Sequence, residues 1–137
     1  MGRVTDRSPD FSPFAQQYAR ARPTYPAGLF AWLASLVDRR RLAWDCATGN
    51  GQAAVSLADH FDRVLATDIS AEQIRYAVEY TRGLPVTIRK LDYRDLPHSG
   101  LPPFDKISIV GMLEHVGYKN YATIMGVVHQ MLKPDGL

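Results

Sequence analysis

The sequence predicts a single α/β domain in which a parallel β-sheet of about four strands carries helices on both faces. Short apolar segments alternate along the chain with segments of helical spacing, a pattern typical of a parallel sheet. Two of the apolar segments end in an acidic residue, and a glycine-containing turn follows the first of them. With 137 residues, 46% of them hydrophobic and 22% charged, the chain has the size and composition of one globular domain.

Local patterns predict the strands and helices in chain order. Thr24 can cap a first helix, with Pro26 in its first turn, and Ser70 with Gln73 forms a capping box that opens a helix running to about Arg82. The strands are predicted at Leu42–Cys46, Arg63–Asp68, Val86–Leu91 and Lys106–Met112. The other helices are predicted at Gln52–His60 and Asn120–Lys133, and residues 96–103 are expected to form a loop.

The turn after the first strand has the features of a cofactor loop. Gly49 and Gly51 lack a Cβ atom, so the backbone there can adopt a positive φ and approach a ligand closely. Asp68 ends the second strand and lies 17 residues after Gly51. This is close to the ~20-residue spacing expected between the glycine turn and a carboxylate that binds ribose hydroxyls. This spacing fits both S-adenosylmethionine (SAM) and NAD, and a turn that binds no ligand is a third interpretation. Asp45 favours SAM, because its carboxylate suits the cationic end of methionine and would lie unfavourably near a pyrophosphate.

The chain resembles the class I SAM-dependent methyltransferases, and two groups of motifs carry this resemblance. Residues 14–26, the Asp45 loop and residues 66–70 resemble the branch that includes the trans-aconitate methyltransferases. Residues 86–96 and 104–121 resemble the cyclopropane fatty acyl phospholipid synthases. The resemblance implies a Rossmann-like sheet of strand order 3-2-1-4-5-7-6, of which this chain would hold the part 3-2-1-4. The sequence ends in a turn similar to the one that leads into the fifth strand of the family.

The candidate cofactor residues lie at the ends of the predicted strands. Asp68 is expected to accept hydrogen bonds from ribose hydroxyls, and Ile69 offers an apolar face to adenine. Asp45 would orient the methionine ammonium, beside the backbone of Gly49 and Gly51.

Further cofactor contacts are expected from two other segments. The resemblance implies that Asp92 accepts a hydrogen bond from the adenine amino group, with Tyr93 beside it, although Asp92 could instead cap a turn. Tyr18 and Arg22 could close the site from residues 1–26, which are expected to act as an N-terminal lid. No metal site is predicted.

The catalytic candidates follow the fourth strand. In cyclopropane synthases, the resemblance implies, a glutamate matching Glu114 helps to hold a bicarbonate that removes a proton after an alkene is methylated; His115 lies next to it. The cysteine of that family aligns with Thr48, and its later histidine and tyrosine fall beyond Leu137. We therefore expect methyl transfer to a small-molecule or lipid-like acceptor rather than complete cyclopropanation. The alternatives are a non-catalytic remnant that binds SAM or self-associates, and purely structural roles for Glu114 and His115.

Composition restricts the partners of the chain. The net charge of +2 and the single short basic run at residues 39–41 argue against nucleic-acid binding. The one cysteine, Cys46, cannot form an intrachain disulfide, which favours a cytoplasmic location, and no segment approaches the ~18 apolar residues of a transmembrane helix. We expect a homo-oligomer, because the fourth strand would have an unpaired edge on which only the charge of Lys106 opposes pairing with another chain. The apolar residues Ile124, Val128 and Met131 would border this edge.

Overall fold

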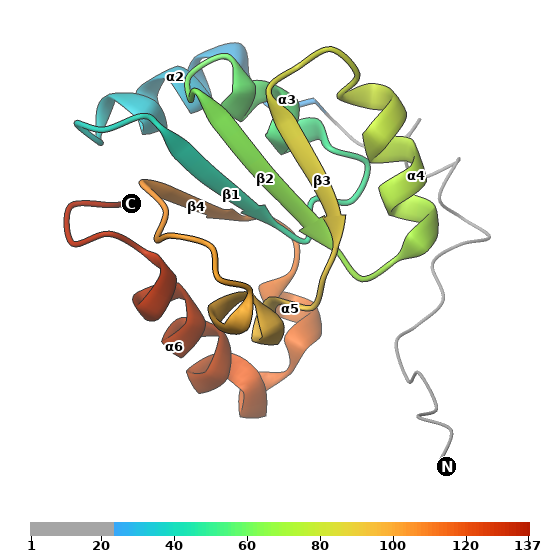
Figure 1. The fold of residues 1–137 in the computed structure, drawn as a ribbon, viewed down its shortest axis with the longest axis vertical. Coiled ribbons are helices and arrows are strands. Elements are labelled where there is room, and N and C mark those ends of the chain that lie inside the picture. The colour runs from blue at the N-terminus through green and yellow to red at the C-terminus, as the bar shows by residue number, and fades with distance from the viewer. Residues whose placement is uncertain (1–23) are drawn as a thin grey trace.

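Four parallel strands in the order β3-β2-β1-β4 lie at the centre of the structure, with helices on both sides of the sheet (Figure 1). The structure is a computed structural model that describes residues 24–137. The strands are β1 (Leu42–Cys46), β2 (Arg63–Asp68), β3 (Val86–Lys90) and β4 (Lys106–Ile109). The helices are α2 (Ala27–Ser35), α3 (Gln52–Ala58), α4 (Ala71–Tyr80), η2 (Tyr93–His98), α5 (Leu113–Val116), η3 (Tyr118–Asn120) and α6 (Tyr121–Met131). The predicted fold class and strand order are confirmed.

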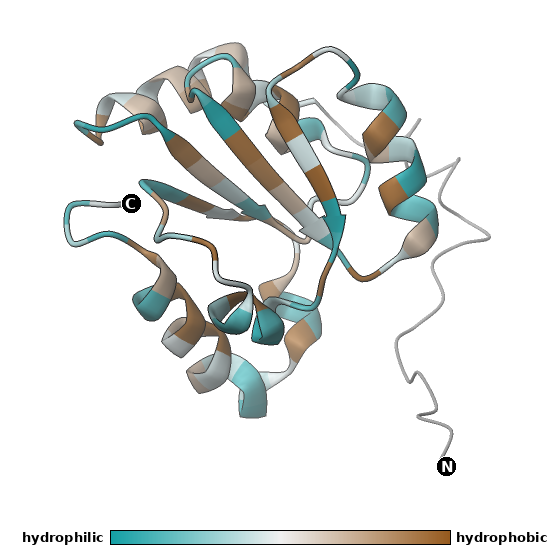
Figure 2. Ribbon diagram, viewed as in Figure 1, coloured by the Kyte–Doolittle hydropathy of each residue, from teal (hydrophilic) through white to brown (hydrophobic). Residues whose placement is uncertain are grey.

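Each face of the sheet has its own apolar core, because successive residues of a strand point to opposite faces. Ala43 of β1 packs in a cluster with Phe30 of α2 and Leu57 of α3. Its neighbour Trp44 packs in the other cluster, which includes residues of η2 and α6. Figure 2 shows the consequence along β2 and β3, which are apolar in the middle and hydrophilic at their carboxyl tips. The central strands β1 and β2 are thus buried on both faces, whereas the edge strand β3 alternates between half-buried and exposed residues.

Several predicted elements differ from the structure by one or two residues at their ends, and three differences have an identifiable structural cause. Thr24 does not cap α2, because Pro26 takes the N-cap position with an extended backbone, and no side chain caps this helix. Strand β4 ends at Ile109 rather than Met112, since Gly111 adopts a φ of 72° that interrupts the extended chain. Residues 93–98 form the 3₁₀ helix η2, so part of the expected 96–103 loop is helical; the fully buried Leu96 holds this turn against the core.

The outer edge of β4 is partly paired, which corrects the expectation of an unpaired edge. The backbone N–H of Ile107 donates to the carbonyl of Leu137 at 2.9 Å, and the Leu137 N–H donates to the carbonyl of Asp105 at 3.2 Å. Phe104 and Leu132 form a parallel bridge just before this point. The final residues of the sequence therefore cover the amino half of the edge.

The other features expected to promote self-association are also buried within the chain. Lys106, the predicted guard, is only 5% exposed, and burial lowers the pKa of its ammonium. Ile124 and Met131 are 0% and 4% exposed, and Val128 is half-buried. Helix α6 packs this apolar side inward, near η2, so a second copy of the chain is not needed to cover it.

Asp105 fastens the C-terminal turn to the amino end of the sheet. Its carboxylate accepts hydrogen bonds from the backbone N–H groups of Arg41 and Leu42, at 3.0 and 2.9 Å, and from the Lys133 ammonium at 2.7 Å. Burial alone would raise the pKa of Asp105, but these hydrogen bonds hold it below its ordinary value. A surface hollow of about 350 Å³ lies beside this ion pair, at the end of the sheet opposite the predicted cofactor site.

Candidate functional site

The glycine loop between β1 and α3 is held by hydrogen bonds to the end of β2. The backbone N–H of Thr48 donates to the Thr67 carbonyl at 2.9 Å, and that of Gly49 donates to Oδ2 of Asp68, also at 2.9 Å. The Gly51 N–H donates to the Thr48 carbonyl at 3.0 Å. These three N–H groups are used within the protein, whereas a dinucleotide loop directs its N–H groups to a pyrophosphate. Thr48, Gly49 and Gly51 therefore have no backbone N–H available for a pyrophosphate.

Gly51 is required by helix packing as well as by backbone conformation. Its φ is +91°, and a Cβ atom at this position would lie 3.2 Å from Cγ2 of Thr81 and 3.5 Å from Ala77. The predicted close approach at Gly51 is thus an approach to α4, whereas Gly49, with a φ of 58°, is partly exposed and can border a ligand.

Asp68 has acceptor capacity left for a ligand. Its Oδ2 accepts from the Gly49 N–H at 2.9 Å and its Oδ1 from the Ser70 N–H at 2.8 Å. An ionised carboxylate offers about four lone-pair positions, so each oxygen keeps one for an incoming hydroxyl. Ile69, the next residue, is 50% exposed and remains available as an apolar platform.

Residues 45–52, which span the glycine loop, contain several buried oxygen acceptors, and Asp45 is one of them. It is 2% exposed and accepts a hydrogen bond from the Thr48 hydroxyl at 2.7 Å. Within residues 24–137, Oδ1 of Asn50 and Oε1 of Gln52 are buried without a hydrogen-bond partner. Neither residue was predicted, and their only signal in the sequence is a carboxamide next to the glycines. This set of acceptors fits a donor such as the methionine ammonium of SAM.

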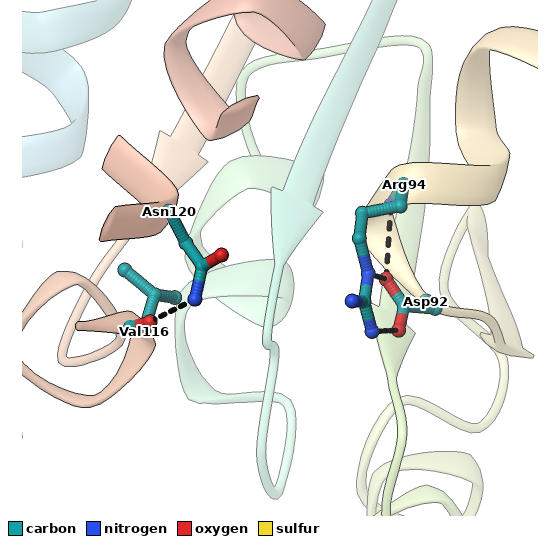
Figure 3. Close-up of polar contacts among 4 residues, drawn as sticks. All are labelled: Asp92, Arg94, Val116 and Asn120. Atoms are coloured by element: carbon teal, nitrogen blue, oxygen red, sulfur yellow. Dashed lines mark hydrogen bonds and ion pairs between the residues drawn. The ribbon is translucent and has the colours of Figure 1, made fainter. Parts of the chain in front are cut away.

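Asp92 caps η2 and is also held by a neighbouring arginine (Figure 3). Its Oδ1 accepts from the backbone N–H of Arg94 at 3.0 Å and from Nε of the same residue at 2.9 Å. Nη2 of Arg94 donates to Oδ2. These hydrogen bonds keep the pKa of Asp92 below its ordinary value. The turn-capping alternative is therefore realised, and the Asp92–Arg94 ion pair was not predicted. Tyr93 is half-buried, and its burial raises the pKa of the phenol.

Three carboxylates lie near Cys46 at the carboxyl end of the sheet. Burial raises the pKa of the Cys46 thiol, and the charges of Asp45, Asp68 and Asp92 raise it further. These carboxylates lie at the tip of β1, at the tip of β2 and just after β3, so the parallel register brings them to one end of the sheet. Cys46 itself stays protonated and is no nucleophile.

Glu114 and His115 lie on α5, which follows the carboxyl end of β4 and so stands at the same end of the sheet as the glycine loop. Both side chains are exposed, and Glu114 makes no hydrogen bond with the part of the chain that the structure describes. The Cys46 thiol contacts Sδ of Met112 at 3.5 Å, which joins the tip of β1 to this segment. After α5, Nδ2 of Asn120 donates to the Val116 carbonyl at 2.6 Å and closes the turn (Figure 3).

Some predictions concern residues outside those described. Tyr18 and Arg22, and most of the expected lid at residues 1–26, precede Thr24. Among residues 24–137, no three His, Cys, Asp or Glu side chains form a group that could hold a metal ion. The helices found there are all too short or too polar to cross a membrane.

Known methyltransferases are similar to this chain in both sequence and fold. Residues 43–136 match the family model of a methyltransferase domain. The cyclopropane-fatty-acyl-phospholipid synthase of Escherichia coli is 47% identical over 94 residues, which cover 68% of this chain and 24% of the synthase. The chain thus spans about a quarter of the length of that relative.

Solved structures agree with the sequence match. The DhpI–SAM–HEP complex superposes with a TM-score of 0.75 at 26% identity, over 92% of this chain and 59% of DhpI. The cyclopropane synthase MmaA2 from Mycobacterium tuberculosis has the same fold, with a TM-score of 0.66 at 18% identity over 78% of this chain and 39% of MmaA2. The family and the SAM complex support the prediction of SAM as the cofactor. This chain therefore belongs to the class I SAM-dependent methyltransferase family.

Proposed function

We propose that this chain binds SAM at the carboxyl end of its sheet and transfers the methyl group to a lipid-like acceptor. The observation that carries the proposal is the position of Asp45, Asp68 and Asp92 at or just after the carboxyl ends of β1, β2 and β3, next to the glycine loop. Their protein partners leave lone pairs free on Asp68 and Asp92, so these carboxylates can still accept hydrogen bonds from donors on a ligand. SAM supplies such donors in its ammonium, its ribose hydroxyls and its adenine amino group.

The chain's own residues would position the reactants rather than activate them. SAM, when bound, supplies an already activated methyl group on a sulfonium, so the protein must hold the donor in line with the acceptor and exclude water. Asp45, with the unpartnered oxygens of Asn50 and Gln52, would hold the ammonium end. Asp68 would hold the ribose, and Ile69 would cover the adenine.

The identity of the acceptor rests on the relatives and on the surface beyond β4. The E. coli relative is named as a synthase acting on fatty acyl phospholipids. Around α5 and α6, Val110, Tyr118, Tyr121 and Met125 are exposed, which gives this region an apolar surface suited to an acyl chain. Glu114 and His115 stand on the same segment and would act on the acceptor side. A small apolar molecule would fit the same surface, so the transfer assay includes both phospholipids and short-chain fatty acids as acceptors.

Calorimetric titration with SAM, S-adenosylhomocysteine and NAD tests the proposal. We expect binding of the first two and none of NAD, because Thr48, Gly49 and Gly51 have no backbone N–H left for a pyrophosphate. Incubation with methyl-labelled SAM and either unsaturated phospholipid vesicles or short-chain fatty acids then tests transfer. Binding without transfer to either acceptor would instead support the non-catalytic alternative.

The extent of the domain, its location and its self-association are also proposed. Residues 1–137 would act as one SAM-binding domain, with residues 1–26 as its lid, in a reducing cytoplasmic setting. Association of two copies along the carboxyl half of β4 is proposed because, in the described chain, β4 is the last strand on that side of the sheet and only its amino half is paired with the C-terminal residues.

A further inference from the structure

The carboxylate of Asp92 is more constrained than the other two carboxylates of the site. Asp68 accepts hydrogen bonds from the backbone N–H groups of Gly49 and Ser70, whereas Asp92 also accepts hydrogen bonds from the Arg94 guanidinium. Arg94 supplies three donors to it: its backbone N–H and Nε to Oδ1, and Nη2 to Oδ2. The two side-chain hydrogen bonds form a planar fork, which fixes both the position and the plane of the carboxylate (Figure 3).

The Asp92 carboxylate keeps one lone-pair position free beside its three hydrogen bonds to Arg94. Each carboxylate oxygen has about two lone-pair positions. Oδ1 accepts two hydrogen bonds from Arg94 and is saturated, whereas Oδ2 accepts one and keeps one position free. The ion pair thus leaves a single free acceptor position on the Asp92 carboxylate, and rotation of that carboxylate would break the fork.

Arg94 can hold this geometry without being part of the core. Its side chain is 63% exposed against 27% for Asp92, and its guanidinium carbon lies 5.8 Å from the centre of the Tyr93 ring. The titratable groups around the pair are Asp95, the neutral Tyr93 phenol and the neutral Cys46 thiol, together with Asp45 and Asp68. The positive charge of Arg94 offsets the negative charge of the Asp92 carboxylate.

We propose that Arg94 is a positioning residue for base recognition: it orients Asp92 so that the one free lone pair of Oδ2 meets the amino group of adenine. This inference rests on the proposed SAM site and deepens it, because it assigns the discrimination between a 6-amino and a 6-keto purine to an ion pair. A keto oxygen at that position would face an acceptor and be repelled.

The experiment compares S-adenosylhomocysteine with its 6-keto analogue, S-inosylhomocysteine, by calorimetric titration. The wild-type protein should bind the amino ligand at least tenfold more tightly, the ratio that one satisfied hydrogen bond provides. In Arg94→Ala, the affinity for the amino ligand should fall about five- to tenfold, while that for the keto ligand changes less than twofold. Arg94→Lys keeps the charge but not the planar fork, so its discrimination should also be reduced.

Arg82→Ala is the matched control, because Arg82 also forms an exposed arginine–carboxylate ion pair: its Nη2 donates to both oxygens of Glu79 at 2.7 Å, just after the end of α4. It should leave both affinities unchanged. A merely structural role of Arg94 would weaken both ligands equally and keep the ratio, which would overturn the inference. Failure of the proposed function has a different outcome, since the wild-type protein would then bind neither ligand.

Discussion

Replacing Asp68 by asparagine changes the acceptor at the centre of the candidate site while preserving its size. In the structure the carboxylate accepts from the Gly49 and Ser70 N–H groups, at 2.9 and 2.8 Å, and keeps one lone pair on each oxygen. The amide retains one oxygen and turns an NH₂ group toward the other donor. Both the loop and a bound ribose therefore lose an acceptor.

The expected loss of affinity follows from the number of hydroxyls affected. One hydrogen bond from a hydroxyl to a charged acceptor contributes roughly 1–3 kcal/mol, which corresponds to about a five- to 150-fold increase in Kd for S-adenosylhomocysteine. The stability of the unliganded protein should fall by about 1 kcal/mol, since Asp68 is partly exposed and water can replace one hydrogen bond. Titration calorimetry and urea unfolding measure the two effects separately.

Asp105→Asn provides the control for this variant. Asp105 also accepts from two backbone N–H groups, those of Arg41 and Leu42, but it lies at the opposite end of the sheet and is 2% exposed. It should lose more stability than Asp68→Asn and bind S-adenosylhomocysteine with unchanged affinity once folded. Equal affinities for wild type and Asp68→Asn would refute the assignment of Asp68 to the ligand.

Four further outcomes are expected. The pKa of Asp105 is lowered in the folded state, so its ion pair with Lys133 should stabilise the protein above the unfolded pKa of ~3.9. This stabilisation should be lost as the pH falls through the folded pKa of Asp105. In Lys133→Met, urea unfolding at a series of pH values should show the loss of stability beginning at a higher pH. Cys46, whose pKa is raised by burial, should react with a thiol reagent at about pH 8 only after unfolding in urea, and rapid reaction of the native protein would contradict its burial. Proton NMR of unsaturated phospholipids incubated with protein and SAM should show no cyclopropane methylene signal, since Thr48 replaces the cysteine of the cyclopropane synthases; such a signal would show that this expectation is wrong. Light scattering at micromolar concentration should detect a dimer if the carboxyl half of the β4 edge associates, and a monomer at all concentrations would exclude that association.

The sheet could be predicted from sequence because its pattern is local and repeated. Each strand is a short apolar run, and Asp45 and Asp68 stand where those runs end, so the parallel order alone brings them to one edge. The capping of α4 by Ser70 is likewise a local pattern, and the structure shows its hydroxyl accepting from the Gln73 N–H at 3.3 Å.

The features that escaped prediction depend on contacts that spacing does not reveal. The Asp92–Arg94 fork needs a specific rotamer at each residue, and a capping aspartate has the same sequence signature without it. The burial of Met131 depends on where α6 packs, and the pairing of Ile107 with Leu137 depends on a turn that folds back along β4. Helical periodicity at Ile124 showed an apolar side but not which surface covers it.

The two hydrogen bonds of Asp68 connect the glycine loop to α4, because the same residue that donates to Oδ1, Ser70, also caps this helix. Behind the loop, Gly51 rests against Ala77 and Thr81 of the same region. The loop, the tip of β2 and both ends of α4 are therefore tied together before any ligand arrives. A ligand that enters such a preorganised site does not have to freeze the loop, so little conformational entropy is lost at this part of the site on binding. Amide hydrogen exchange at Gly49 and Ser70 should accordingly be slow in the unliganded protein and change little when a nucleoside is added.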